Sequence, residues 1–375
     1  MGLLRLLLAI SVVIAHTGAI FGFNIVGGSY AVQAFYIISG FYMSLILNEK
    51  YIGKNNSYTL FISNRLLRLY PVYWTVLVIM LIWSLGLFLK TGHPDYTVGI
   101  FQQYRHQMTA TTYGYLIFTN IFLVGQDMVM FLGLNVQTGV LFFAKDFHLT
   151  NPKLFSFLFV PQAWTIGVEI LFYLVAPFLV RRSIKVVCLF IALSLLSDLL
   201  IVRLGLPADP WLDRFFPGQL VFFLAGNLSY RGYKKIQDIE IKKFYLFGIT
   251  MTLILFTLFF YKLSFPKKGL LYFIVFAAAL PFIFKYTKQL KFDNKIGELS
   301  YPVYISHMFV YMLIGNLAFT RFLGTGLTVA IGSVLFSILL NRFISEPIEK
   351  IRQRRLNKPR QVPVVVNLPQ QRRLA

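Results

Sequence analysis

Two ionisable side chains, Arg5 and His16, interrupt the first long apolar stretch of the chain, residues 3–22. An ionisable group is costly inside a membrane helix and therefore tends to line a pathway or a reaction site. The two residues are eleven apart, which is about three helical turns, so both side chains lie on one helix face. We predict that they act as a functional pair, with His16 deep in the membrane and Arg5 near its inner surface. The alternative is a snorkelling arginine and a packed histidine.

A pair of arginines, Arg65 and Arg68, stands just before the third long apolar stretch. Side chains three residues apart are neighbours on a helix. Two adjacent guanidinium groups offer planar sets of donors that suit phosphate or carboxylate oxygens. The pair therefore predicts an anion-binding clamp at the inner face of the membrane. A plain positively charged anchor is the alternative.

A polar stripe marks the apolar stretch 164–180, where Thr165, Glu169 and Tyr173 follow one another at intervals of four. That spacing places them on one face of a helix. Trp164 precedes the stripe and is of a type that gathers at the membrane–water interface. A carboxylate at this depth needs a partner, so we expect Glu169 to reach a histidine or an arginine of another helix.

A second polar face lies near the C-terminal end, where Ser300, Tyr304 and His307 follow the i, i+4, i+7 pattern of one helix face. Hydroxyl groups on such a face commonly pack between membrane helices. We therefore expect His307 to pack beside the site and not to react.

The elements that must position these residues are membrane helices. Hydrophobic residues make up 57% of the 375 residues and charged residues 13%, and the mean hydropathy is +0.68. A soluble chain carries roughly 25% charged residues to wet its surface, so this composition excludes an ordinary soluble domain. The single cysteine, Cys188, excludes a disulfide framework and a cysteine-rich metal site.

A helix that crosses a bilayer needs about 20 mainly apolar residues. The sequence predicts an all-α, polytopic membrane protein of about ten transmembrane helices, at residues 3–22, 28–47, 69–89, 164–180, 186–204, 215–230, 244–261, 270–286, 298–315 and 326–345. With the N-terminus inside, most of the 36 lysines and arginines fall on the cytoplasmic side, as the positive-inside rule requires. We therefore expect both termini to be cytoplasmic, and the net charge of +22 needs no nucleic-acid partner.

Residues 1–345 then form one membrane-embedded domain, and residues 346–375 form a basic cytoplasmic tail that we expect to be disordered. Segment 90–163 lies outside, and its part 115–134 is apolar enough to resemble an eleventh span. A crossing there would move every later basic loop to the outer side. We therefore predict a partly re-entrant segment, which is tolerated only against protein or a wet cavity.

In this order, the motifs resemble those of the acyltransferase-3 family, integral-membrane enzymes that O-acylate bacterial surface carbohydrates. The matching pieces span nearly the whole chain. They are Leu4-Arg5 with His16; residues 35–41; Arg65-x-x-Arg68 with Tyr70-Pro71; Trp164-Thr165 with Glu169 and Phe172-Tyr173; residues 297–301 with Tyr304 and His307; and Glu346-Pro347. An acidic residue that often precedes the second motif in the family is missing here, so no role is assigned to an acid there.

The resemblance implies an O-acetyltransferase that takes an acyl group, typically acetyl, from cytoplasmic acetyl-coenzyme A (acetyl-CoA). The acceptor would be a hydroxyl of a lipid-linked surface or exported glycan, such as O-antigen, capsule or exopolysaccharide. The enzyme would lie in the bacterial inner membrane and hold no cofactor tightly. His16 matches the family's catalytic histidine, Arg5 the arginine eleven residues before it, and Arg65 and Arg68 its donor-binding pair.

Residue chemistry adds roles to this outline. A neutral His16 would act as a general base on the acceptor hydroxyl or carry the acyl group as an acyl-imidazole, with Glu169 orienting its ring. We see no spacing typical of metal ligands. Candidate lining residues of the site are Ser39, Trp164, Tyr173, Ser300, Tyr304 and His307.

A transporter or flippase of a lipid-linked glycan is the rival hypothesis, with the same buried groups lining its pathway. Such carriers often contain inverted repeats, and we detect none in this sequence. The sequence makes no prediction of the oligomeric state.

Overall fold

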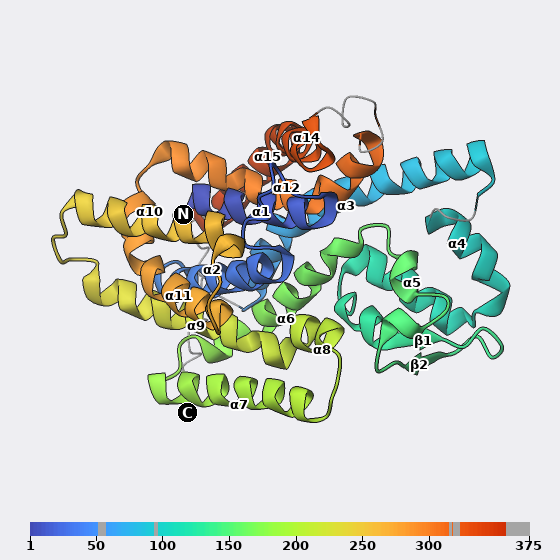
Figure 1. Ribbon diagram of the computed structural model, residues 1–375, viewed down its shortest axis with the longest axis horizontal. Coiled ribbons are helices and arrows are strands. Elements are labelled where there is room, and N and C mark those ends of the chain that lie inside the picture. The colour runs from blue at the N-terminus through green and yellow to red at the C-terminus, as the bar shows by residue number, and fades with distance from the viewer. Residues whose placement is uncertain (52–57, 94–96, 315–316, 318–322, 358–375) are drawn as a thin grey trace, which may run out of the picture.

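The computed structural model describes residues 1–51, 58–93, 97–314, 317 and 323–357, and helices dominate it (Figure 1). Its α-helices are α1 (Gly2–Thr17), α2 (Gly28–Glu49), α3 (Tyr58–Thr91), α4 (Thr97–Tyr104), α5 (Ala110–Phe122), α6 (Trp164–Leu179), α7 (Ile184–Arg203), α8 (Ala208–Arg214), α9 (Phe216–Ile236), α10 (Lys243–Phe259), α11 (Lys268–Thr287), α12 (Lys291–Ile314), α14 (Thr325–Leu340) and α15 (Glu346–Asn357). Two three-residue strands, β1 (Leu132–Leu134) and β2 (Leu141–Phe143), pair antiparallel. The predicted all-α class is confirmed.

Each of the ten expected spans lies largely within one helix. Seven helical stretches of the described chain are long and apolar enough to cross a membrane: α2, α3, Pro161–Leu179, α7, Lys243–Lys262, α11 and Thr325–Leu356. Helix α1 has only 16 residues, and α9 and α12 are less apolar. These helices indicate a multi-pass membrane protein, whereas the count of ten and the side of each terminus stay predictions.

The first expected span is too long, because α1 ends at Thr17. Gly18 follows with φ 106°, a conformation that glycine adopts readily and other residues do not. His16 therefore lies in the last turn of α1 and not, as expected, several residues before its end. The third expected span is too short, since α3 begins at Tyr58 and includes Arg65 and Arg68.

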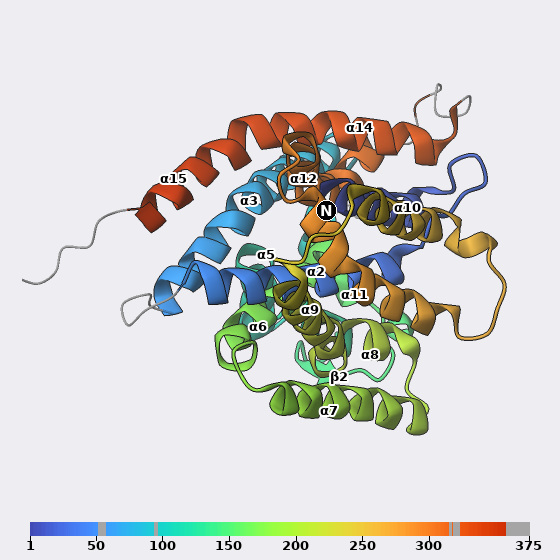
Figure 2. The same cartoon turned by 90° about the vertical axis from the view of Figure 1, so that its left-hand side faces the viewer.

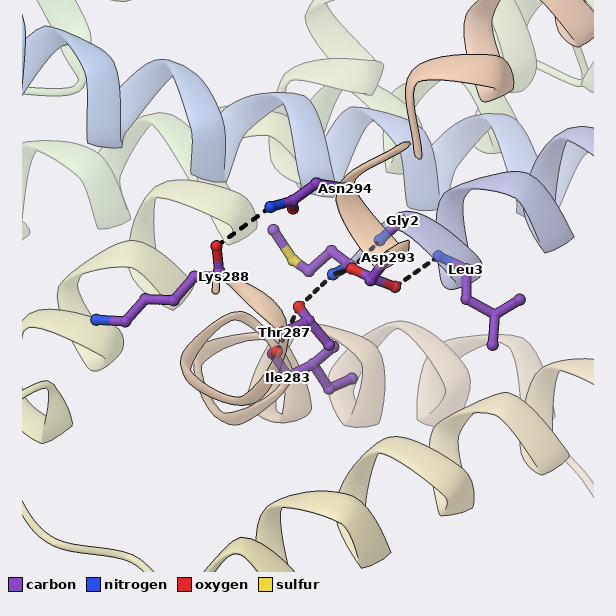
Figure 3. A network of polar contacts seen from close by, with 8 residues as sticks. Gly2, Leu3, Ile283, Thr287, Lys288, Asp293 and Asn294 are labelled. Carbon is purple, nitrogen blue, oxygen red and sulfur yellow. Dashed lines mark hydrogen bonds and ion pairs between the residues drawn. The ribbon is translucent and has the colours of Figure 1, made fainter. Parts of the chain in front are cut away.

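The beginning of α1 is fixed to α12, as Figure 3 shows. Asp293 in the first turn of α12 accepts hydrogen bonds from the backbone N–H groups of Gly2 (2.7 Å) and Leu3 (2.9 Å). The N-terminal ammonium group of Met1 pairs with the same carboxylate at 2.5 Å. Burial opposes the ionisation of Asp293, but these hydrogen bonds outweigh it and lower the pKa of the carboxyl group. A carboxylate here also faces the positive end of the α1 helix dipole.

Two glycines let the backbones of α1 and α12 touch. A Cβ atom on Gly2 would lie 1.6 Å from the carbonyl oxygen of Asp293, and one on Gly297 would lie 2.7 Å from the Cα atom of Gly2. Small residues permit this close approach of membrane helices. The contact sets the register in which Arg5 and His16 on α1 meet the polar face of α12.

Helices α2 and α9 meet through a similar contact. A Cβ atom on Gly40 would lie 1.8 Å from the carbonyl oxygen of Phe223, and one on Gly226 would lie 2.0 Å from that of Ile37. The close packing holds the face of α2 that carries Ser39.

A separate layer of short elements, α4, α5 and the β1–β2 pair, lies to one side of the long helices in Figure 1. Tyr70, Tyr73 and Trp74 of α3 donate hydrogen bonds to carbonyl oxygens at the end of α5. Segment 115–134 is not one helix, because α5 ends at Phe122 and Leu123 adopts a left-handed conformation. The 13 residues of α5 extend about 20 Å, which is too short to cross a core about 30 Å thick. Its re-entrant position in a membrane stays a prediction.

The first part of the tail is not disordered, contrary to our expectation. Residues 346–357 form α15, which a π-helical turn, Asn341–Ser345, joins to α14. Glutamates in its first turn and arginines in its last turn suit the helix dipole. Figure 2 shows α15 continuing the line of α14 and lying beside α3. The rest of the tail, residues 358–375, lies outside the described residues.

Candidate functional site

Three cavities lie between α1, α2, α3, α6 and α12. The arginine cavity, of about 600 Å³, is lined by Arg5, Arg65 and Arg68 and extends to α15. The middle cavity, of about 100 Å³, contains Glu169. The histidine cavity, of about 160 Å³, contains His16.

Neighbouring cavities share lining residues. The arginine and middle cavities share Arg5, Tyr42, Arg68 and Tyr301. The middle and histidine cavities share Val32 and Tyr304. The three cavities therefore form one series that leads from the arginines to His16.

Three arginines of the arginine cavity have no counter-ion in direct contact. Within the described parts of the chain, no acidic side chain lies within 4.0 Å of Arg5, Arg65 or Arg68. Arg65 is 5% exposed, and its Nε atom has no hydrogen-bond partner. A buried donor without a partner is costly, so the cavity suits an anion with several oxygen atoms. The structure thus brings the three expected donor-binding residues together.

Glu169 is held in the middle cavity by two short hydrogen bonds. Its carboxylate accepts one from the Ser39 hydroxyl (2.6 Å) and one from the Tyr173 hydroxyl (2.6 Å). No hydrogen bond or ion pair joins it to His16 or to an arginine in the chain as described, so the expected contact is wrong. The spacing of four placed Tyr173 on the same helix face as Glu169, which allows their bond, whereas the Ser39 bond depends on how α2 packs against α6.

His16 meets His307 instead. Nδ1 of His16 lies 3.3 Å from Nε2 of His307, and the ring centroids are 5.0 Å apart. His307 is completely buried, whereas His16 is exposed at the cavity. The sequence analysis did not predict this direct contact of the two rings, and the packing role of His307 stays a prediction.

Hydrogen bonds to carbonyl oxygens assign the tautomers of the pair. Nδ1 of His307 lies 2.6 Å from the carbonyl oxygen of Tyr304, and Nδ1 of His16 lies 2.9 Å from that of Val12. A carbonyl oxygen only accepts hydrogen bonds, so both Nδ1 atoms carry hydrogen. In the neutral rings the one Nδ1 hydrogen of His16 is then shared between the Val12 carbonyl oxygen and Nε2 of His307, and Nε2 of His16 keeps a free lone pair. This atom is the one available for chemistry.

Tyr304 connects α12 to the beginning of α6, at the boundary between the middle and histidine cavities. Its hydroxyl group lies 2.7 Å from that of Thr165 and donates to the carbonyl oxygen of Gln162 at 2.9 Å. The Gln162 amide donates in turn to the carbonyl oxygen of Ile305 at 2.7 Å. These bonds hold the backbone that supports His307. Ser300, by contrast, lines the middle cavity.

The other wall of the histidine cavity is a cluster that our sequence analysis missed. The Arg214 guanidinium group pairs with Asp209 at 2.5 and 2.9 Å and lies 4.3 Å from the centroid of the Trp164 ring. Burial raises the pKa of the neighbouring Asp213, and the Asp209 carboxylate raises it further. Three ionisable residues in the short segment between two expected spans were the signal available in the sequence.

In the described residues no group of three or more His, Cys, Asp or Glu side chains is placed to hold a metal ion.

The family model of an acyltransferase domain matches residues 1–342 of the chain. No curated protein and no solved structure matches it. The matched region contains His16, His307 and all of the lining of the middle and histidine cavities, and it ends before α15.

Proposed function

Because the chain belongs to the acyltransferase-3 family and is a membrane acyltransferase, we propose that it transfers an acetyl group from acetyl-CoA to a hydroxyl of a surface or exported glycan. The observation that supports this most is the series of three cavities, neighbours of which share lining residues, between three arginines without counter-ions and the free Nε2 atom of His16. Such a series suits a donor with an anionic head and a long, thin arm that ends in the reactive group.

The donor would enter from the arginine cavity at the cytoplasmic face. Its phosphate groups would bind Arg65 and Arg68, because guanidinium groups donate pairs of charge-assisted hydrogen bonds to phosphate oxygens. Its pantetheine arm would pass Arg5 and follow the middle cavity, whose lining is mostly apolar and aromatic. The thioester would then lie near Tyr304, at the border of the histidine cavity.

The acceptor would enter the histidine cavity from the other face. Gln162, Asp213 and Arg214 line this cavity, and amide, carboxyl and guanidinium groups all form hydrogen bonds with sugar hydroxyls. We propose that the acceptor is lipid-linked and that the enzyme lies in the bacterial inner membrane. The two substrates would thus meet at His16 from opposite sides.

His16 would act through its free lone pair. Nε2 takes the proton of the acceptor hydroxyl while the oxygen attacks the thioester carbonyl carbon. The carbon–sulfur bond then breaks, and the leaving thiolate takes the proton from the imidazolium ring. In a second route the same atom attacks the thioester first, the carbon–sulfur bond breaks, and the coenzyme A thiolate leaves while the acetyl group stays on the ring as an acyl-imidazole. The acceptor oxygen then attacks the acetyl carbon, the carbon–nitrogen bond breaks, and the hydroxyl proton passes to the freed Nε2 atom and from there to the thiolate. In both routes His307 takes the orienting role that we had assigned to Glu169, since it accepts the Nδ1 hydrogen of His16.

The test is acetyl transfer by the purified protein in detergent or nanodiscs. Radiolabelled acetyl-CoA is supplied with and without glycan acceptor, and acetyl groups on the surface glycan are measured by NMR in cells with and without the gene. We expect label on the acceptor and loss of the acetyl signals without the gene. Label that stays on the protein before acceptor is added would favour the acyl-imidazole route. Unchanged glycan acetylation, together with no transfer or hydrolysis of acetyl-CoA, would contradict the proposal.

A further inference from the structure

Helix α15 brings another arginine to the arginine cavity. Arg352 is 7% exposed and lines the cavity with Arg65 and Arg68. The charges of those two arginines repel that of Arg352. Six basic and three acidic side chains line the cavity, so the lining is net positive. A cluster of like charges at a buried surface is costly unless an anion joins it.

Two arginines dock α15 on α3. The Nε atom of Arg352 donates a hydrogen bond to the carbonyl oxygen of Asn64 at 2.9 Å, and Arg355 donates one to the Ser63 hydroxyl at 2.9 Å. Both acceptors directly precede Arg65 on α3, in the region where Figure 2 shows the two helices side by side. Arg352 lines the cavity and Arg355 does not, although both tie the same helix to α3.

In the part of the chain that the structure describes, Arg352 has one acidic partner, Glu349, which lies three residues before it and forms an ion pair with its guanidinium group. The Glu349 side chain is 43% exposed, and it lines the same cavity. The carboxylate thus occupies the position that a phosphate oxygen would take at this guanidinium group, since both are anionic acceptors for the same donors.

We propose that Arg352 binds a phosphate group of the acyl donor and that Glu349 competes with the donor for the Arg352 guanidinium. The inference rests on the proposed function and goes beyond it, because α15 lies outside the residues that the family model matches. It makes α15 a part of the donor site and gives the two residues opposite effects on donor affinity.

The test measures the dissociation constant of acetyl-CoA by titration calorimetry and KM and kcat with the full-length protein. Arg352→Ala should weaken acetyl-CoA binding about ten-fold or more, as expected for loss of a charged hydrogen bond, and raise KM with little change in kcat. Arg352→Lys should recover part of the affinity. Glu349→Gln should tighten binding a few-fold. Arg355→Ala is the matched control, because it loosens α15 without changing the cavity lining, and it should leave affinity unchanged.

Opposite shifts in the Arg352 and Glu349 variants, with an unchanged control, would support the inference. An equal loss of affinity in Arg352→Ala, Arg355→Ala and Glu349→Gln would overturn it, because α15 would then act only by packing. Wild-type affinity in Arg352→Ala, with weakened binding in Arg65→Ala, would overturn the inference alone. Absence of acetyl-CoA binding by the unaltered protein would overturn the proposed function and this inference with it.

Discussion

The two ends of the cavity series are built in opposite ways. At the arginine cavity Arg5, Arg65 and Arg68 have no acidic partner within 4.0 Å in the described residues, and the buried Nε atom of Arg65 lacks a hydrogen-bond partner. At the histidine cavity hydrogen bonds hold both rings, and a single Nε2 atom is left free. Charged groups that still need a partner are suited to binding a ligand. Side chains whose orientation is already fixed by hydrogen bonds are suited to catalysis. Substitutions at the first should therefore change affinity, and those at the second should change rate.

The largest effect is expected at the catalytic end. His16→Ala removes the free lone pair of Nε2. Because positioned acid–base groups contribute about 10²–10⁴-fold to rate, the rate of acetyl transfer should fall by a factor in this range or more. Acetyl-CoA affinity should stay unchanged, because the arginine cavity is not altered. The measurements are kcat and donor dissociation constant at matched amounts of inserted protein. Normal turnover in this variant would end the proposed mechanism even though the family assignment would stand.

His307 comes next. His307→Phe fills the space but cannot accept the Nδ1 hydrogen of His16, and we expect kcat to fall about ten-fold or more, on the scale of a lost buried hydrogen bond. His307→Gln offers an acceptor for His16 and a donor for the Tyr304 carbonyl group, so it should recover part of the rate. Donor affinity should be unchanged in both. Equal rates in the Phe and Gln variants would show that the ring serves only to fill space.

Arg65→Ala and Arg68→Ala test the binding end. Each removes charge-assisted hydrogen bonds of about 1.5–3 kcal/mol, so acetyl-CoA should bind roughly ten-fold or more weakly while kcat changes less. Lysine at either position should restore binding only in part, because it lacks the planar donor pair. Titration calorimetry checks this prediction. Unchanged acetyl-CoA affinity in both alanine variants would show that Arg65 and Arg68 serve only as a positively charged anchor.

The smallest effect is expected at Asp293, which binds the beginning of α1. Helix α1 carries Arg5 at the arginine cavity and His16 at the histidine cavity. Asp293→Asn should cost about 1 kcal/mol, the usual size of a charge at a helix terminus, and should change affinity and rate together and only slightly. Folding lowers the pKa of this carboxyl group, so its stabilising effect is present at pH values above its unfolded pKa of about 3.8. The effect is lost as the pH falls through the lower, folded pKa.

Thermal unfolding at several pH values measures the Asp293 contribution. The difference between wild type and Asp293→Asn should be constant near neutral pH and shrink in acid. A difference that grows as the pH falls would show that the carboxylate does not stabilise the fold.

Much of this architecture follows from spacing within single helices. The all-α class, the approximate helix positions, the Arg65–Arg68 pair and the link from Glu169 to Tyr173 were all predictable, because each depends on residues close in sequence. The contact of His16 with His307 was not, since it joins residues 291 apart. Spacing defines the face on which a side chain lies but not which faces meet. Which helix faces meet is decided by close contacts such as that of Gly2 with Gly297. The end of α1 was also not predictable from spacing, because it depends on the conformation of Gly18.

The shared lining of the cavities has a consequence for the membrane itself. A passage with openings toward both faces would let protons and other cations leak and so discharge the membrane potential. The middle cavity, of about 100 Å³, has the smallest volume of the three. Arg5 and Arg68 line this cavity, and we expect their charges to repel cations from it, as arginine does in water channels that exclude protons. We therefore expect the arginines that attract the donor also to prevent the leakage of protons and other cations through the enzyme.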